Sequence, residues 1–189
     1  VSGEIMVNHV SLSNISPASW REQCGVVMQD GFIFSETIAR NIATKDVNID
    51  QERLKMACRI ANLDDYINIL PQGLETKIGA IGSGISGGQK QRILIARAVY
   101  KNPHYIFFDE ATSSLDTQNE RIIYDNLQEF FKDRTVVVIA HRLSTVKNAD
   151  QIIVLKDGEI VERGTHKSLV QRKGSYYNLV KNQLELEES

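Results

Sequence analysis

The sequence predicts an α/β fold built around a parallel sheet, and three patterns support this prediction. Two short runs, Tyr105–Asp109 and Thr135–Ala140, are apolar almost throughout, as is typical of strands buried on both faces of a parallel sheet. A helical pattern separates them, with Asp116 or Thr117 as its N-cap, so strand, helix and strand form one crossover unit. A further helix signal begins at Ser86, directly after a glycine-spaced loop.

Length and composition favour one ordinary globular domain. The chain has 189 residues, of which 42% are hydrophobic, and its 22 basic and 24 acidic residues leave a formal net charge of −2. This balance gives no overall field that would attract nucleic acid or an anionic membrane surface, so we expect no nucleic-acid partner. Cys24 and Cys58 each lie in an apolar stretch, which predicts buried thiols rather than a disulfide.

Neither a membrane span nor a secretion signal is apparent in the sequence. No run approaches the roughly 20 apolar residues that a spanning helix needs, and the first residues lack the basic and apolar regions of a signal peptide. The chain starts at Val1 and enters a strand-like run, Gly3–Asn8, at once. We therefore expect these residues to be part of a longer protein.

The first half of the chain predicts a strand followed by a helical insertion. Gly25–Met28 has the pattern of a buried strand, and Ser35–Leu70 has that of several short helices with polar faces. Pro71–Gly73 and three spaced glycines then mark a loop before the helix that starts at Ser86.

The last third predicts a hairpin and then helices. Gln151–Lys156 and Glu159–Arg163 have strand patterns and flank Asp157-Gly158, a strong signal for a two-residue turn between antiparallel strands. The pattern of Thr165–Leu186 is helical again, and its acidic end is expected to fray.

The most informative string is Ile85–Arg92, which reads Ile-Ser-Gly-Gly-Gln-Lys-Gln-Arg. Two adjacent glycines lower the stability of a helix start, so their presence favours a ligand whose close approach needs the space. The backbone N–H groups there, the hydroxyl of Ser86 and the positive end of the helix dipole together suit a phosphate. The alternative is a glycine-rich turn in which Ser86 is an ordinary N-cap.

Two adjacent carboxylates, Asp109 and Glu110, follow the first apolar run. Ligands of α/β proteins bind at the carboxyl ends of such strands. One carboxylate can serve Mg²⁺ and the other can orient a water toward a phosphate. His141 follows the second run, where it can donate to a phosphate oxygen or to that water.

The order of these motifs resembles the nucleotide-binding domain of the ATP-binding cassette family over nearly the whole chain. The matches are, in chain order, the glutamine loop at Gln29, the signature motif at Ile85–Gln89 with isoleucine in place of leucine, the Walker B pair Asp109 and Glu110, the D-loop Ser114–Asp116 and the switch histidine His141. The resemblance implies a P-loop NTPase-like parallel sheet flanked by helices, with a helical subdomain inserted.

The resemblance also implies that ATP is the substrate and Mg²⁺ the cofactor. Glu110 is then the catalytic glutamate, which polarises the attacking water, and His141 holds the γ-phosphate and water in line. Asp109 and Gln29 are the residues on the metal side, and Gln29 is also counted among the nucleotide contacts.

Two such domains pair head to tail in this family. The resemblance implies that Ser86, Gly87 and Gly88 of one copy cap the nucleotide held by the other, and that Gln89 and Asp116 also contact nucleotide. The second partner is the transmembrane domain, whose coupling helices touch the loop before the signature motif. The domain would thus lie at the cytoplasmic face of the cell membrane.

Within the family, Phe32–Ile42 resembles exporters, and Gly3–Asn8 and Ile15–Arg21 are similar to peptide or bacteriocin exporters, some of which carry a peptidase domain. The expected organisation is residues 1–34 for the start of the core up to the glutamine loop, 35–85 for the helical subdomain, and 86–189 for the signature helix, Walker B motif, switch histidine and C-terminal helices.

The phosphate-binding loop Gly-x-x-x-x-Gly-Lys-Ser/Thr and its strand are missing, because no Gly-Lys pair occurs in these 189 residues. We therefore expect the chain alone to be inactive and to lack affinity for ATP, and its strand Thr135–Ala140 to present an open edge. Two alternatives stay open: a cassette ATPase that acts on nucleic acid or the ribosome, and a cassette that does not hydrolyse ATP.

Overall fold

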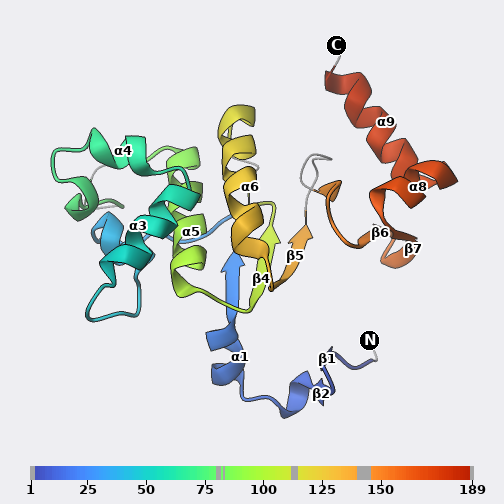
Figure 1. The fold of residues 1–189 in the computed structure, drawn as a ribbon, viewed down its shortest axis with the longest axis horizontal. Coiled ribbons are helices and arrows are strands. Elements are labelled where there is room, and N and C mark those ends of the chain that lie inside the picture. Colours follow the sequence, from blue (N-terminus) through green and yellow to red (C-terminus); the bar gives the residue numbers. More distant parts are fainter. Residues whose placement is uncertain (1–2, 80–81, 83, 112–114, 140–145, 188–189) are drawn as a thin grey trace. The chain divides into compact units, whose positions relative to one another are not determined.

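The computed structural model describes residues 3–79, 82, 84–111, 115–139 and 146–187 (Figure 1). They belong to two compact units, Val1–Val137 and Val138–Ser189, and each unit is described by itself below. In the described part of the chain, no helix combines the length and apolar character needed to cross a membrane.

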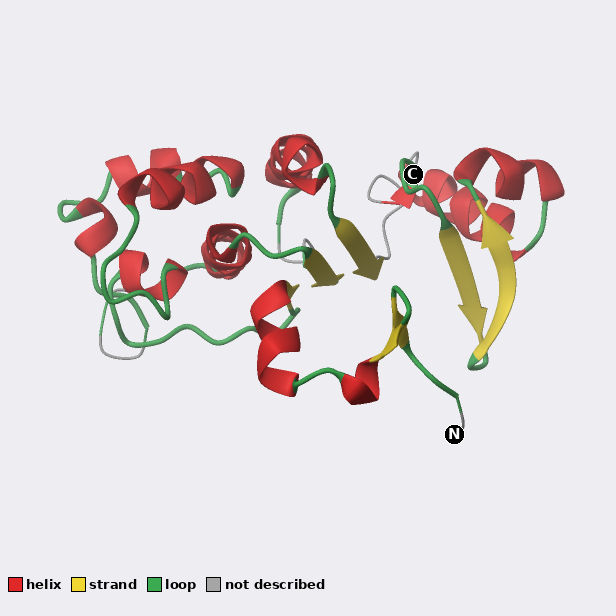
Figure 2. Cartoon of the chain, turned by 60° about the horizontal axis from the view of Figure 1, so that its bottom comes forward, coloured by secondary structure: helices red, strands yellow, loops and turns green. Residues whose placement is uncertain are grey.

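The first unit is organised around a three-stranded sheet of β3 (Cys24–Val27), β4 (Tyr105–Asp109) and β5 (Thr135–Ile139), in that order. β3 and β4 run parallel, with Cys24 opposite Tyr105 and Val27 opposite Phe108. The arrows of all three strands point the same way in Figure 1, and Figure 2 shows the strands in yellow. Helix α6 (Thr117–Phe131) connects β4 to β5. The predicted α/β fold with a parallel sheet and its crossover unit is confirmed.

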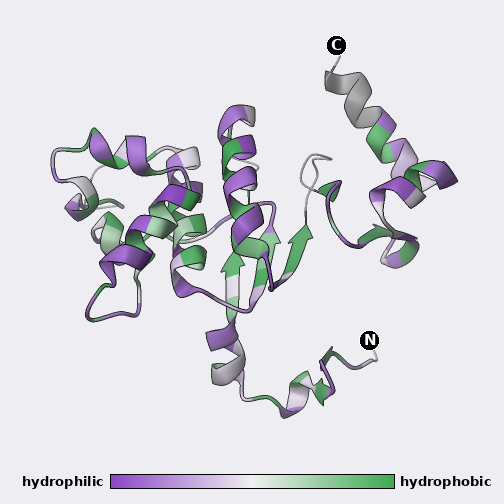
Figure 3. Cartoon of the chain, in the orientation of Figure 1, coloured by the Kyte–Doolittle hydropathy of each residue, from purple (hydrophilic) through white to green (hydrophobic). Residues whose placement is uncertain are grey.

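The prediction that the strand at Thr135–Ala140 is buried on both faces is wrong for the described residues. Figure 3 colours β5 as hydrophobic, yet Val137 is 45% exposed and Ile139 is 55% exposed. β5 lies at the end of the sheet, where no further described strand lies beside it, and every second residue along it is exposed, so one of its faces has little cover from the described residues. The expected open edge is therefore present, while Ala140 lies outside the described residues.

Helix α5 (Gly87–Lys101) contributes more buried residues than any other helix of the first unit. Its residues Ile93, Ile95 and Ala96 have no exposed surface. Their burial requires neighbouring elements to cover the apolar part of the helix. β3 covers one part of α5, and the helices of the inserted segment cover another.

The segment expected to be a helical insertion forms short helices, as predicted. They are α2 (Ile38–Ile42), α3 (Gln51–Ile60), α4 (Asp64–Asn68) and the 3-10 turn η2 (Gly73–Glu75). In the N-terminal part, the short strands β1 (Met6–Val7) and β2 (Val10–Ser11) pair antiparallel. They are followed by the 3-10 turn η1 (Leu12–Asn14) and the helix α1 (Pro17–Gln23).

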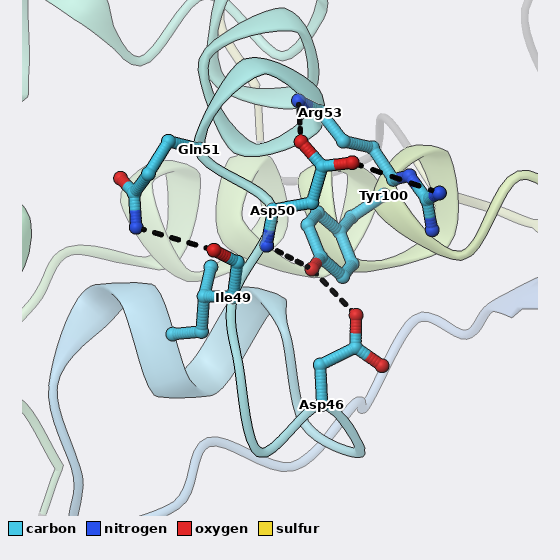
Figure 4. Close-up of polar contacts among 6 residues, drawn as sticks. All are labelled: Asp46, Ile49, Asp50, Gln51, Arg53 and Tyr100. Carbon is cyan, nitrogen blue, oxygen red and sulfur yellow. Dashed lines mark hydrogen bonds and ion pairs between the residues drawn. The ribbon is translucent and has the colours of Figure 1, made fainter.

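A polar cluster joins the end of α5 to the start of α3 (Figure 4). The hydroxyl of Tyr100 donates to Asp46 Oδ2 at 2.6 Å and accepts from the backbone N–H of Asp50 at 3.1 Å. Asp50 is the N-cap of α3, where its side chain accepts from the Arg53 N–H at 3.0 Å. The Arg53 guanidinium also lies over the Tyr100 ring, 5.5 Å from its centroid. The cluster fixes where α3 begins along α5.

The second unit is a hairpin covered by two helices. β6 (Ile152–Lys156) and β7 (Glu159–Gly164) pair antiparallel, and φ is 52° at Asp157 and 82° at Gly158. Positive φ at both central residues is what a type I′ turn requires, so the predicted two-residue hairpin is confirmed. One face of the hairpin packs on α8 (His166–Arg172) and α9 (Ser175–Glu187), with a core that contains Ile152, Val154, Leu169, Tyr176 and Val180.

Both cysteines are free and buried, as the sequence predicts. Burial raises the pKa of the Cys58 thiol to about 12. A buried thiol of this kind behaves as a small apolar core residue rather than as a nucleophile.

We predict that Tyr100→Phe lowers the free energy of unfolding by about 2 kcal/mol, because Asp46 and the Asp50 N–H lose their shared partner. Urea unfolding at pH 7 measures it as a lower midpoint with an unchanged slope. The control is Tyr66→Phe, since the Tyr66 hydroxyl has no hydrogen bond among the described residues. Equal midpoints for the two variants would contradict a role of the cluster in stability.

Candidate functional site

The predicted carboxylates and the predicted glutamine lie at the same end of the sheet. β4 ends at Asp109, and Glu110 follows it directly. The last parallel pair is Val27 with Phe108, and Gln29 and Glu110 each follow that pair by two residues at the same end of the sheet. Gln29 is exposed, and both carboxylate residues are partly exposed. The arrangement leaves the three side chains accessible to a ligand at the carboxyl end of the strands.

The backbone of Glu110 has an unusual conformation. Its φ is 49°, in the left-handed region that non-glycine residues other than Asn and Asp seldom adopt. Among the other non-glycine residues with positive φ, most are Asn or Asp, and Lys173 is the C-cap of α8. Glu110 has neither explanation. Such strained residues cluster at active sites, where a fixed side-chain direction is needed.

The turn that carries Gln29 is fixed by close packing on α5. A Cβ added at Gly31 would lie 2.3 Å from Leu94 Cδ1, so a larger residue there would require the Leu94 side chain to move. The buried side chain of Gln91 donates a long hydrogen bond of 3.5 Å to the Met28 carbonyl. Residues of α5 therefore hold the chain on both sides of Gln29.

Arg97 and Asn41 fix the segment that follows this turn. Arg97 donates to the carbonyl of Phe32 at 2.9 Å and to that of Asn41 at 2.7 Å. The Asn41 side chain has no exposed surface and exchanges hydrogen bonds with the backbone of Phe34, at 2.9 Å from its N–H and 3.0 Å to its carbonyl. Burial lowers the pKa of the Arg97 guanidinium. These bonds satisfy backbone groups of an irregular segment that has no ladder of its own.

The start of α5 is capped by Ser86, which the sequence pattern left open as the alternative to a phosphate site. Ser86 is the N-cap, and its Oγ accepts from the Gln89 N–H at 3.1 Å while its own N–H donates to Gln89 Oε1 at 2.8 Å. This reciprocal pair is a capping box. Gly87 and Gly88 are the first two residues of the helix, and Ser86 and Gly87 are exposed. The ordinary cap and the anion site are compatible, since the Ser86 hydroxyl hydrogen and the first N–H groups remain outside the box.

Of the two residues that can cap α6, the structure selects Asp116. Its Oδ1 accepts from the Asn119 N–H at 2.9 Å and its Oδ2 from Asn119 Nδ2 at 2.6 Å. These bonds hold the pKa of the Asp116 carboxyl below its ordinary value, and the bond from the Asn119 backbone N–H has the larger effect. Asp116 is therefore an ionised, exposed cap at the start of α6.

His141 and Ser114 lie outside the described residues, so their predicted roles stay predictions. Sequence reasoning missed Asn41 and Arg97, which position the Gln29 segment. A signal was available, because each is a polar residue among apolar neighbours in a helix. Such residues are kept in a core when they satisfy buried backbone groups.

Asp109 and Gln29 can supply the kind of ligand that Mg²⁺ requires. Carboxylate and amide oxygens are hard donors, and in sites for nucleotides Mg²⁺ takes one or two carboxylates together with phosphate oxygens and waters. The donor set at the end of β3 and β4 therefore fits a magnesium ion that arrives with a nucleotide.

Known proteins resemble this chain closely. The profile of the family described as ABC transporter matches residues 1–113. Over 185 residues the chain is 46% identical to the leukotoxin translocation ATP-binding protein LktB of Mannheimia haemolytica and 45% identical to that of Bibersteinia trehalosi, covering 98% of this chain and 26% of each relative. It matches the structure of a bacterial Atm1-family ABC exporter with ATP bound at a TM-score of 0.92 and 38% identity, over 97% of this chain and 32% of that one. The chain spans about a quarter of the length of these curated relatives.

We predict that the free energy of unfolding of Glu110→Gly is about 1 kcal/mol higher than that of Glu110→Ala, because glycine adopts positive φ without strain. The comparison removes the same side chain in both variants. The matched control is Asp109→Gly against Asp109→Ala in the adjacent strand residue, where alanine should be the more stable. Urea midpoints measure all four, and alanine being the more stable residue at position 110 would refute the strained conformation.

Proposed function

The chain belongs to the ABC transporter family, and from that premise we propose that it works as the ATP-hydrolysing motor domain of a membrane exporter. The observation that carries the proposal is the strained Glu110 directly after β4, beside Asp109 and at the same end of the sheet as Gln29. Phosphoryl transfer requires a positioned residue that orients the attacking nucleophile, and a carboxylate can serve as its base.

In this proposal Glu110 accepts a proton from the water that attacks the γ-phosphorus of ATP. The bond between that phosphorus and the β–γ bridging oxygen breaks, and ADP and inorganic phosphate leave. His141 would donate to the γ-phosphate and keep the water in line, while Asp109 and Gln29 would hold Mg²⁺ and its waters. When bound, Mg²⁺ neutralises charge on the phosphate oxygens.

The second part of the proposal is a head-to-tail pair of such domains. Ser86, Gly87 and Gly88 of one copy would then cap the nucleotide bound by the other, with Gln89 and Asp116 close to the same nucleotide. The exposed and capped start of α5 supports this role, because N–H groups at a helix start and the helix dipole favour a phosphate.

The third part concerns the partner in the membrane. We propose that residues 35–85 form a helical subdomain that contacts coupling helices of a transmembrane domain, at the cytoplasmic face of the cell membrane. The resemblance assigns this contact to the loop Thr76–Ala80 before the signature motif, and Ala80 lies outside the described residues. Peptides or proteins are the proposed cargo, since the relatives named above are translocation proteins for a leukotoxin.

We predict that Glu110→Gln in the full-length protein lowers the kcat of ATP hydrolysis by at least about 100-fold and leaves ATP binding intact, because the water loses its base. Phosphate release measures kcat, and nucleotide titration measures binding. The control is Glu129→Gln, since Glu129 at the end of α6 forms an exposed ion pair with Lys132. This variant should hydrolyse ATP at the wild-type rate. Wild-type kcat in Glu110→Gln would remove Glu110 from the mechanism.

A further inference from the structure

We propose that Asn62 is a positioning residue that fixes the spacing between the start of α5 and the start of α6. The inference rests on the proposed function, in which Ser86 at the start of α5 and Asp116 at the start of α6 both face the nucleotide of a neighbouring copy. The polar chain that joins them runs through Arg92, Asn62 and Asn119.

Asn62 is placed by the end of α3. Its φ is 53°, its N–H donates to the Arg59 carbonyl at 3.0 Å, and the N–H of Leu63 donates to the Cys58 carbonyl at 2.9 Å. These two bonds and the left-handed residue define a Schellman motif, a helix end in which asparagine is one of the few residues tolerated. The motif turns the backbone sharply and leaves both the carbonyl and the side chain of Asn62 available to other helices.

The carbonyl of Asn62 binds α5. Arg92 Nη1 donates to it at 2.7 Å, and Arg92 lies six residues after Ser86 on the same helix. Burial lowers the pKa of the Arg92 guanidinium, while the negative charge of Asp116 opposes that shift. The buried Nε of Arg92 has no hydrogen-bond partner among the described residues. The bond to the Asn62 carbonyl therefore holds this partly buried cation.

The side chain of Asn62 binds α6. Its Nδ2 donates to Asn119 Oδ1 at 2.8 Å, and Asn119 in turn donates to both carboxylate oxygens of Asp116, from its N–H and its Nδ2. One amide side chain thus sets the orientation of the next. Because Asn119 Oδ1 accepts from Asn62 while Asn119 Nδ2 donates to Asp116, the bond to Asn62 holds the Asn119 amide in the orientation that meets the Asp116 carboxylate.

Three segments far apart in sequence are joined in this way, and two of them carry residues of the proposed site. A neighbour's nucleotide would meet Ser86 and Asp116 together, so the distance between them has to match the nucleotide in the closed pair. The chain through Asn62 keeps that distance fixed before the pair closes, which reduces the ordering needed at closure.

A control variant can distinguish this positioning role from a general stabilising link between α3 and α6. Asn126 lies seven residues after Asn119 on α6, and its Nδ2 donates to the carbonyls of Arg59 and Ile60, at 3.3 Å each. It joins the same two helices but has no bond to Asp116. Asn126→Ala is therefore a matched control.

The experiment compares Asn62→Gly, Asn119→Ala and Asn126→Ala in the full-length protein by steady-state ATP hydrolysis. Asn62→Gly keeps the left-handed conformation and the carbonyl for Arg92, so it removes only the link to α6. Asn119→Ala keeps the backbone N–H that caps α6. We expect kcat to fall about fivefold in the first two variants, as for one lost hydrogen bond, with an unchanged KM for ATP. KM should hold because, in the proposed pair, Ser86 and Asp116 reach the ATP only at closure, after the other copy has bound it.

The double variant Asn62→Gly with Asn119→Ala should lose no more activity than either single one, since both break the same link. Asn126→Ala should retain the wild-type kcat even where its melting temperature falls as far as theirs. Wild-type kcat in Asn62→Gly, or an equal loss of kcat in Asn126→Ala, would overturn the positioning role. A wild-type protein that does not hydrolyse ATP would instead overturn the proposed function on which the inference rests.

Discussion

The burial of α5 is the constraint on which the rest of the first unit depends. The helix packs against β3 on one side and against α2 and α3 on another, and Ile93, Ile95 and Ala96 within it are fully buried. Burying an Ile side chain stabilises a fold by about 1.5–3 kcal/mol. Both the sheet and the helical insertion therefore take their positions from the same helix, and a shift of α5 would have to move each of them.

Polar side chains of α5 fix the positions of the segments that pack against the helix. Apolar packing alone tolerates sliding, whereas hydrogen bonds to particular backbone groups fix a register. Tyr100 fixes the start of α3, Arg92 fixes its end, and Arg97 fixes the segment after Gln29. Helix α5 thus positions the proposed nucleotide contacts at both Gln29 and Ser86. A site built partly from loops keeps its dimensions when one rigid element holds those loops.

The sequence predicted those features that depend on local pattern. The strand at Tyr105–Asp109, the helix after Ser86, a cap at Asp116 or Thr117 and the Asp157-Gly158 hairpin each follow from periodicity or from turn and capping chemistry within a few residues. The exposure of β5 depends on its place in the sheet, and the conformation of Glu110 depends on the surroundings that impose it. The bonds from Asn62 join residues about 30 and 57 positions apart, and no local pattern indicates such partners.

Native-state hydrogen exchange tests most directly whether α5 is the element that holds the first unit together. The account predicts that the amides of residues 93–99 exchange only through global unfolding, and that the Leu63 amide at the end of α3 opens with the same free energy. Amides of α6 should open at lower free energy, since α6 covers only one part of the sheet. Exchange of residues 93–99 through local opening, at a lower free energy than the amides of β3 or α6, would contradict the account.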